Sequence, residues 1–373
     1  MKATFSPRAL AAAVTTLLAL SGAAHAGDTF LAGIKKHMVL TNTVPDNGDQ
    51  NPYAIAVSPI TAGKLKAGDV LVDNFNNAAN LQGLGSTIVN YRPDSKEMTL
   101  FAQIPRTLEQ CPGGVGLSTA MTVLKSGWVI VGSTPSNDGM TDTKGAGCLM
   151  VLDTNGKLVD VWSGPDINDP WGNMAVIDNG DKVTLFVSNA GFGVGSAKGT
   201  PPVVNLATVL RLDIEVPAGQ PPKVLKRTVV ASGFGEQADK SVFLIGPTGL
   251  VYGKDDKLYV SDALGNRISE IWDAASRDTS AGIGRTLTHD GLLLRPLALT
   301  STPQGHLLAT NGSNGKVVEI DPATGEQLAA RWIDANKAQT PPGSGDLFGI
   351  AITPQGDGFY YVTDDNNNLV LAK

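Results

Sequence analysis

Six short polar residues each follow an apolar segment, and side chains of this kind can hold a cation or cap a turn. They run from position 74 to position 364 and are 58 residues apart on average. Calcium takes oxygen ligands from Asp, Asn and backbone carbonyls. Short Asp and Asn side chains also hydrogen-bond nearby amides in tight turns. Turn capping is the simpler interpretation, so we expect no cofactor, with a divalent ion such as calcium as the alternative. The six residues are Asn74, Ser133, Asn189, Asp262, Asn311 and Asp364.

A second group of candidates lies at the start of each repeat. Asn173 follows a small residue at a position where the other repeats carry Ile or Leu, and three aromatic residues directly precede the small residue in their own repeats. A buried Asn must find hydrogen-bond partners, so it either satisfies neighbouring backbone or meets a ligand. The residues that we expect to bind a ligand are Tyr53, Trp171, Asn173, Asn189, Asp262 and Phe348.

Other catalytic patterns find little support in the chain. His37, His289 and His306 fall at different places in the repeat, which argues against a zinc site. No Gly-x-Ser-x-Gly stretch is present. In the Gly-rich segment 191–200 the lysine precedes the last glycine and two prolines follow, whereas a phosphate-binding loop needs Gly-Lys-Ser/Thr opening a helix. We therefore assign no catalytic residue.

The polar residues end the second strand of a unit that occurs six times. In each unit a small residue opens an apolar strand, a turn follows, and a second apolar strand ends in a polar pair. Third strands follow, for example at 87–91 and 316–320. Six copies of a four-stranded unit predict an all-β, six-bladed β-propeller. The second strands are expected at 70–74, 129–133, 185–189, 258–262, 307–311 and 360–364.

The small residues and the two ends of the chain support the prediction of a closed, six-bladed ring. A residue without bulk is needed where the innermost strands crowd around an axis. The sixth unit lacks an outer strand, because the chain ends after Leu369–Leu371. We expect Phe30–Leu40 to pair with the last blade and close the ring. The small residues are Ala54, Gly116, Gly172, Gly249, Ala298 and Gly349.

The N-terminus has the pattern of a secretory signal peptide. Lys2 and Arg8 precede an uncharged apolar run, and Ala24-His25-Ala26 matches the small-x-small cleavage site. We expect a signal peptide over 1–26, cleavage after Ala26, and one propeller domain over 27–373 in the periplasm or outside the cell. No later stretch is apolar and long enough to span a membrane.

The cysteines and the net charge fit an exported protein. Cys111 and Cys148 are the two cysteines of the chain, and in an oxidising compartment we expect them to form a disulfide. Removal of residues 1–26 takes the formal charge from −6 to −8, which argues against nucleic acid as a partner. The partner is left open as a small molecule, a glycan or a protein.

Two segments carry a family resemblance. The segment 258–268, Leu-Tyr-Val-Ser-Asp running on to Gly-Asn-Arg-Ile, resembles the NHL-repeat signature, and 309–325 resembles a YVTN-type repeat. Such propellers include scaffolds, lyases and lactonases, so the resemblance implies an architecture rather than a function. It also implies that the turns after the second strands lie on one face. These turns are long in the first three blades, at 74–86, 133–147 and 189–207, which predicts a raised rim there.

We interpret the chain as a non-catalytic binding module that uses this loop-rimmed face. The alternative is a metal-dependent lactonase or hydrolase of the gluconolactonase-like propeller type. That family holds its ion near the axis with one Glu, Asn residues and an Asp. The first blade here begins Asn51-Pro52-Tyr53 without Glu, and Thr248 and Leu297 stand where Asn or Asp is expected.

Overall fold

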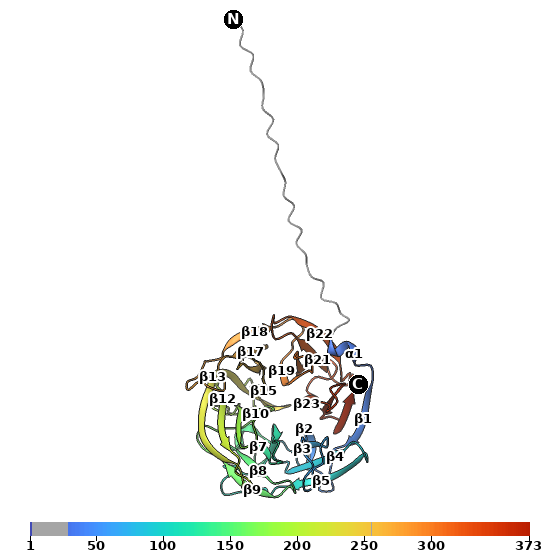
Figure 1. The fold of residues 1–373 in the computed structure, drawn as a ribbon, viewed down its shortest axis with the longest axis vertical. Coiled ribbons are helices and arrows are strands. Elements are labelled where there is room, and N and C mark those ends of the chain that lie inside the picture. Colours follow the sequence, from blue (N-terminus) through green and yellow to red (C-terminus); the bar gives the residue numbers. More distant parts are fainter. Residues whose placement is uncertain (2–28, 255) are drawn as a thin grey trace.

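The computed structural model describes Met1, residues 29–254 and residues 256–373. Within this part of the chain, strands form six antiparallel sheets around a central axis, and Figure 1 looks along that axis. The six-bladed propeller predicted from the repeat is confirmed. Residues 2–26 of the expected signal peptide lie outside the described residues, so that assignment stays a prediction.

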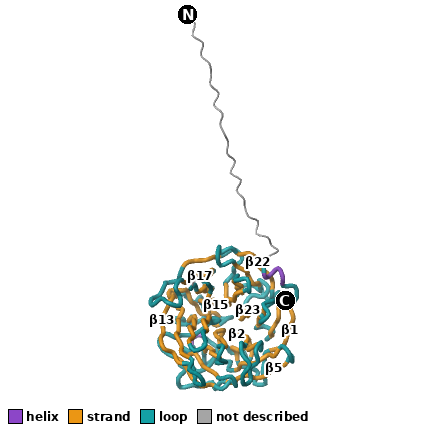
Figure 2. The backbone as a smooth tube through the Cα atoms, viewed as in Figure 1, coloured by secondary structure: helices purple, strands orange, loops and turns teal. Residues whose placement is uncertain are grey.

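The first three blades each run outward from an inner strand at the axis. Figure 2 shows the strands of the ring in orange and the loops that join them in teal. Blade one contains β2 (Gln50–Val57), β3 (Val70–Asn76), β4 (Thr87–Arg92) and β5 (Glu97–Gln103). Blade two contains β6 (Leu117–Val123), β7 (Val129–Ser133), β8 (Cys148–Leu152) and β9 (Leu158–Trp162), with a 3-10 turn at Thr141–Thr143. Blade three contains β10 (Ala175–Asp178), β11 (Lys182–Asn189), β12 (Val204–Glu215), β13 (Lys223–Asp239) and β14 (Phe243–Ile245).

The last three blades repeat the four-stranded pattern, and the sixth is completed by the N-terminal segment. Blade four contains β15 (Pro247–Tyr252), β16 (Leu258–Asp262), β17 (Arg267–Ile271) and β18 (Arg285–His289). Blade five contains β19 (Pro296–Ser301), β20 (Leu307–Asn311), β21 (Lys316–Ile320) and β22 (Gln327–Trp332). Blade six contains β23 (Leu347–Ile352), β24 (Phe359–Thr363), β25 (Asn368–Ala372) and β1 (His37–Asn42).

The small residue at the start of each repeat lets neighbouring blades approach closely. A Cβ atom on Gly172 would lie 1.3 Å from the carbonyl oxygen of Thr248, in the next blade. A Cβ atom on Gly349 would lie 2.5 Å from the carbonyl oxygen of Tyr53, across the point where the ring closes. Both distances are far below van der Waals contact, so packing between blades excludes a side chain at these positions.

The N-terminal segment closes the ring, although only its second half is a strand. β1 pairs antiparallel with β25, from His37 opposite Ala372 to Asn42 opposite Asn368, and Figure 1 shows β1 beside the C-terminus. Closure of the sixth blade is therefore confirmed. The expectation of one strand over Phe30–Leu40 was wrong in its first part, which forms the short helix α1 (Phe30–Gly33).

Helix α1 is held by a buried carboxylate. Glu319 of β21 accepts hydrogen bonds from the backbone N–H groups of Phe30 and Leu31, both at 2.9 Å. The side chain of Thr29 caps the helix by accepting from the N–H of Ala32. First-turn N–H groups have no partner within a helix, so these acceptors favour a helical turn where a strand was expected.

An aromatic cluster fills the axis toward the face from which the inner strands start. The ring of Tyr53 stacks on Phe348 at 3.8 Å between centroids and on Phe75 at 4.6 Å. Trp171 packs edge-on against Tyr53 at 5.9 Å, and Phe243 packs edge-on against Phe75. All five side chains are buried. Phe243 comes from β14, an insertion after the long strand β13 that the repeat did not predict.

None of the helices in the described part of the chain has the length and apolar character needed to cross a bilayer.

Candidate functional site

The Asn residues of the polar ring tie each second strand to the segment that precedes the inner strand. The side chain of Asn74 donates to the carbonyl of Thr43 at 3.0 Å. Asn311 donates to the carbonyl of Leu292 and accepts from the N–H of Leu294, both at 3.0 Å. These side chains satisfy loop backbone, as the turn-capping interpretation predicts.

The ring positions in blades two to four are also occupied by internal hydrogen bonds. Ser133 accepts from the N–H of Gly116 at 3.0 Å. Asn189 accepts from the N–H of Asn168 at 3.1 Å. Asp262 pairs with Arg267 at 2.8 Å and accepts from the N–H of Gly265. In five of the six blades, therefore, the ring residue is engaged with the protein itself.

Asp364 in blade six differs from the other five ring residues. Its backbone N–H donates to the carbonyl of Asp346, the residue just before β23. Oδ1 of Asp364 and Oδ2 of Asp346 are buried, and neither accepts a hydrogen bond from the described residues. Burial, followed by the neighbouring carboxylates, raises the pKa of Asp364 well above its usual range. Burial and Asp365 raise the pKa of Asp346 to about 7.

A third carboxylate completes a cluster with these two. One carboxylate oxygen from each of Asp346, Asp364 and Asp365 lies within 4.8 Å of the other two. The amide of Gln339 donates to Asp346 at 2.5 Å and also to Asp365. Asn336 donates to Asp365 at 2.7 Å. The loop between β22 and β23 thus holds Asp346 and Asp365, and the side chains of Asp346 and Asp364 lie within hydrogen-bond reach of each other.

The cluster opens into a hollow of about 480 Å³ on the loop-rimmed face, which we call the rim hollow. The long loops of blades one and two line it, as predicted. The long loop of blade three does not line it, and the turn between β13 and β14 contributes instead. The lining residues are Asn51, Asn76, Asn80, Leu81, Gln82, Asp138, Gly139, Met140, Lys240, Ser241, Gln339, Ser344, Gly345, Asp346, Asp364 and Asp365.

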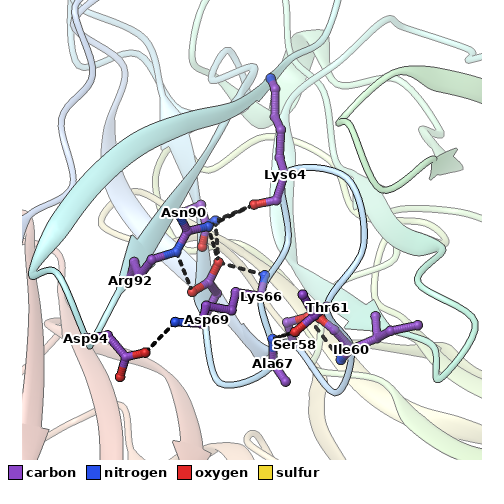
Figure 3. A network of polar contacts seen from close by, with 10 residues as sticks. All are labelled: Ser58, Ile60, Thr61, Lys64, Lys66, Ala67, Asp69, Asn90, Arg92 and Asp94. Atoms are coloured by element: carbon purple, nitrogen blue, oxygen red, sulfur yellow. Dashed lines mark hydrogen bonds and ion pairs between the residues drawn. The ribbon is translucent and has the colours of Figure 1, made fainter.

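Asp69, at the opposite end of blade one, shows how a buried carboxylate is usually satisfied. Its side chain accepts from the N–H of Lys66, from the amide of Asn90 and from Arg92, all within 3.1 Å (Figure 3). Figure 3 also shows Lys66 paired with Asp94 on the surface of this network. The pair Asp346–Asp364 has no comparable set of donors among the described residues, which marks it as available to an external group.

A second pair of buried carboxyl groups lies below the loop of blade three. Asp169 and Glu236 are both fully buried, and burial raises the pKa of Asp169 to about 6 and that of Glu236 to about 8. Lys144 lies 2.8 Å from Asp169 and balances part of this charge. None of the three lines the rim hollow. All four carboxylate oxygens of Asp169 and Glu236 are likewise buried without a hydrogen-bond donor among the described residues, so it is the opening into the rim hollow that distinguishes Asp346 and Asp364 from this pair.

The aromatic candidates Tyr53, Trp171 and Phe348 are brought together, but as the axial cluster rather than as an open channel mouth. Asn173 lies on the axis farther along the inner strands, beside a cavity of about 220 Å³. Its amide donates to the carbonyls of Leu250 and Leu299 and accepts from the N–H of Leu299, all at 3.0 Å. Backbone contacts thus occupy Asn173, and ligand binding by these four residues, Asn189 and Asp262 stays a prediction.

The disulfide expected from the two cysteines is confirmed. Cys111 and Cys148 are bonded, and the bond joins the segment before β6 to the first residue of β8. It therefore fixes the base of the blade-two loop whose tip, Asp138–Met140, lines the rim hollow. The histidines do not converge. In the part of the chain that the structure describes, the aspartate cluster is the one group of three potential metal ligands.

Sequence reasoning missed Asp346, Asp365 and Gln339. A signal was present, because Asp364 stands where blades one, three and five carry Asn, and a second Asp follows it. An ionised Asp cannot donate to a loop carbonyl as Asn does. Blade four also carries Asp at this position, Asp262, which Arg267 and the N–H of Gly265 satisfy, so the residue type alone did not distinguish Asp364, and nothing in the repeat indicated Asp346 as its neighbour.

Comparisons with known proteins identify the fold of the chain but not its function. No protein-family model matches the chain, and a search of curated proteins finds no match, so the NHL and YVTN resemblances stay predictions. A gluconolactonase from Xanthomonas campestris is similar in structure, with a TM-score of 0.52 and 14% identity over 90% of this chain and 88% of that one. A putative gluconolactonase gives a TM-score of 0.53 and 14% identity over 92% of both chains.

Virginiamycin B lyase from Staphylococcus aureus is also similar, with a TM-score of 0.50 and 14% identity over 91% of this chain and 99% of that one. At this level of identity, the three structures establish that the chain shares their six-bladed propeller. They do not establish a shared activity.

Proposed function

We propose that the protein is an exported propeller whose rim hollow binds a small, oxygen-rich molecule and hydrolyses a lactone or ester bond in it. The observation that carries this proposal is the pair Asp346–Asp364. Two buried carboxyl groups with raised pKa open into a polar hollow, and such groups cluster at functional sites. Export is supported by the disulfide, since disulfides persist in oxidising compartments.

The two carboxyl groups are suited to acid and base roles. With a pKa of about 7, Asp346 is partly ionised at neutral pH and can take a proton from water as the water oxygen attacks the carbonyl carbon. Burial and the neighbouring carboxylates raise the pKa of Asp364 well above its usual range, and its protonated form can give a proton to the leaving oxygen as the carbon–oxygen bond breaks. The products are a carboxylic acid and an alcohol, joined in one molecule when the substrate is a lactone.

The choice of a lactone rests on similarity of fold. Two of the similar structures are named as gluconolactonases. The axial ion site expected for such enzymes is not matched residue by residue, because Asn51–Tyr53 lacks the expected Glu and Thr248 and Leu297 stand where Asn or Asp is expected. Aromatic rings fill this part of the axis. We therefore locate the reaction in the rim hollow.

A second candidate is binding without turnover, as the sequence first suggested. The loops of blades one and two form the wall of a hollow with many amide side chains, and rigid scaffolds commonly present binding loops in this way. This candidate needs no acid or base, and it includes glycans among its ligands.

Hydrolysis of a panel of aldonolactones and phenyl esters, followed in a pH-stat, separates the two candidates. We expect turnover near neutral pH that falls at least about 100-fold in Asp346→Asn and is unchanged in Asp94→Asn, whose carboxylate lies at the opposite face. A lactone that raises the melting temperature without being hydrolysed would favour binding. Absence of turnover together with absence of any thermal shift would refute both.

A further inference from the structure

We propose that a second cavity, between blades two and three, binds a neutral pyranose sugar. The turns β6–β7 and β8–β9 line it from blade two, and the turns β10–β11 and β12–β13 line it from blade three. Figure 1 shows these two blades side by side. The turns lie at the strand ends away from the rim hollow, so the inference goes beyond the proposed function. We call the cavity the interblade pocket, and its lining includes Lys125, Trp128, Asp153, Asp181, Val216 and Pro217.

The interblade pocket has the size of a small-molecule site and one aromatic wall. Its volume is about 500 Å³, within the range of about 300 to 1,000 Å³ that is common for ligand pockets. The side chain of Trp128 is partly buried, because it packs against the core that blades two and three share, and it also lines the pocket. The electron-rich face of an indole attracts the weakly positive C–H groups on one face of a sugar ring, as it attracts the edge of another aromatic ring.

The indole N–H of Trp128 is the first polar group without a partner. It donates to none of the described residues. Two other tryptophans, by contrast, satisfy this group internally, since Trp162 donates to Asp160 at 2.8 Å and Trp272 donates to Glu270 at 2.9 Å. The N–H of Trp128 is therefore available to an oxygen of a ligand.

Two carboxylates supply the acceptors. Oδ1 of Asp153 accepts from the N–H groups of Asn155 and Lys157 at 2.8 and 3.0 Å, which fixes the orientation of this side chain. Its Oδ2 and both side-chain oxygens of Asp181 accept no hydrogen bond from the described residues. An ionised carboxylate can only accept, so these three oxygens require a ligand with several donors, such as the hydroxyl groups of a sugar.

Hydrogen bonds between the two blades hold the pocket open before a ligand arrives. The backbone N–H of Lys125 in blade two donates to the carboxylate of Asp178 in blade three at 2.7 Å, and Nζ of Lys125 donates to the carbonyl of Asp178 at 2.8 Å. Within blade three, the carbonyl of Asp181 accepts from the N–H of Val216 at 2.8 Å. A pocket that is already formed loses less entropy when it binds.

The charges in the lining select the class of ligand. The charged lining residues are Lys125, Asp153 and Asp181, and Asp178 already engages the lysine. The groups left for a ligand are one N–H donor and three carboxylate oxygens, which repel a phosphate or a carboxylate. A neutral sugar brings O–H donors for the carboxylates, oxygen acceptors for the indole N–H and a C–H face for the ring.

Nuclear magnetic resonance of the isotope-labelled full chain tests the pocket. The probes are maltose, cellobiose and N,N′-diacetylchitobiose, and the Trp128→Phe variant identifies the indole N–H resonance of Trp128 by its absence. We expect at least one of the three sugars to shift this resonance in a saturable way. One stacking contact and a few exposed hydrogen bonds suggest a dissociation constant of about 1 mM. Saturation transfer from the protein to the sugar provides a second measure of binding.

The informative variants are Asp181→Ala and Trp128→Ala. Asp181 is exposed and its side chain has no partner among the described residues, so its replacement should leave the fold intact and weaken sugar binding at least about tenfold. Trp128→Ala should weaken binding by a similar factor through loss of the stacked face. The matched controls, Asp94→Ala and Trp332→Ala, remove an exposed aspartate and an exposed tryptophan elsewhere, and both should leave binding unchanged.

The outcomes separate this site from the rim hollow. Sugar binding that is lost in Asp181→Ala and retained in Asp346→Asn would support the interblade pocket, whether or not the protein hydrolyses a lactone. Binding that is retained in Asp181→Ala and lost in Asp346→Asn would belong to the rim hollow and overturn the inference. A Trp128 resonance that shifts with none of the sugars would also overturn it, and a shift with tetramethylammonium chloride alone would replace the sugar by a cationic ligand.

Discussion

The replacement Asp364→Asn should change how the stability of the protein depends on pH. The folded protein keeps Asp364 protonated because burial and adjacent carboxylates raise its pKa, whereas the unfolded chain ionises it near pH 4. Between these pH values the folded state binds one more proton than the unfolded state. The free energy of unfolding therefore falls as pH rises, by about 1.4 kcal/mol per pH unit from this group.

The variant lacks this titration, so its advantage over the wild type should grow with pH. From pH 5 to pH 7 the difference in unfolding free energy, variant minus wild type, should increase, with about 3 kcal/mol as the upper limit over these two pH units. Any hydrogen bond gained or lost by the amide is common to both pH values and cancels. Urea unfolding, followed by tryptophan fluorescence at pH 5, 6 and 7, measures the difference directly.

The matched control is Asp94→Asn. Its carboxylate is exposed, and its hydrogen bond to Lys66 lowers its pKa, so the same substitution should give at most a small change of the opposite sign. If the difference for Asp364→Asn stays constant or shrinks as pH rises, Asp364 is ionised in the folded protein. The acid role that we give it would then be wrong.

Three further changes test the fold around the site. Gly172→Ala should destabilise the protein by more than about 4 kcal/mol, because the added methyl group overlaps backbone of the next blade, and this should be seen as loss of soluble folded protein. The control Gly195→Ala should be neutral, because no atom lies within 4 Å of the added methyl group. Asn173→Leu should cost about 3 kcal/mol in urea unfolding, because it leaves inner-strand backbone groups without partners. An unchanged midpoint would show that water replaces the amide. Replacing Cys111 and Cys148 with serine should lower the unfolding free energy by about 4 kcal/mol, because the disulfide closes a loop of 37 residues and so reduces the entropy of the unfolded chain. A much smaller loss would indicate that the unfolded chain is already compact in this region.

Much of the fold could be read from the sequence because a propeller repeats one local pattern. Each second strand was expected where β3, β7, β11, β16, β20 and β24 lie, to within a few residues at their ends. Four of the six residues expected to lack bulk are glycines at which a Cβ atom would strike backbone of a neighbouring blade, namely Gly116, Gly172, Gly249 and Gly349. Repetition made these positions visible, since packing at the axis imposes the same requirement on every blade.

Departures from the repeat were harder to interpret. The helical turn at Phe30 depends on Glu319, which is 289 residues away in sequence. Phe243 enters the axial cluster from an insertion that has no counterpart in the other blades. No local pattern encodes such contacts, because their energy comes from partners that only the folded chain brings near.

The sequence by itself determined the number of blades, the closure by the N-terminal segment and the disulfide partners. Tertiary structure alone decided that the predicted aromatic residues are buried and that Asp346 and Asp365 join Asp364. The physical reason is that the pKa and the available hydrogen-bond donors of a carboxyl group depend on burial and on neighbours in space. The loop before β23 and the turn after β24 set both for this cluster.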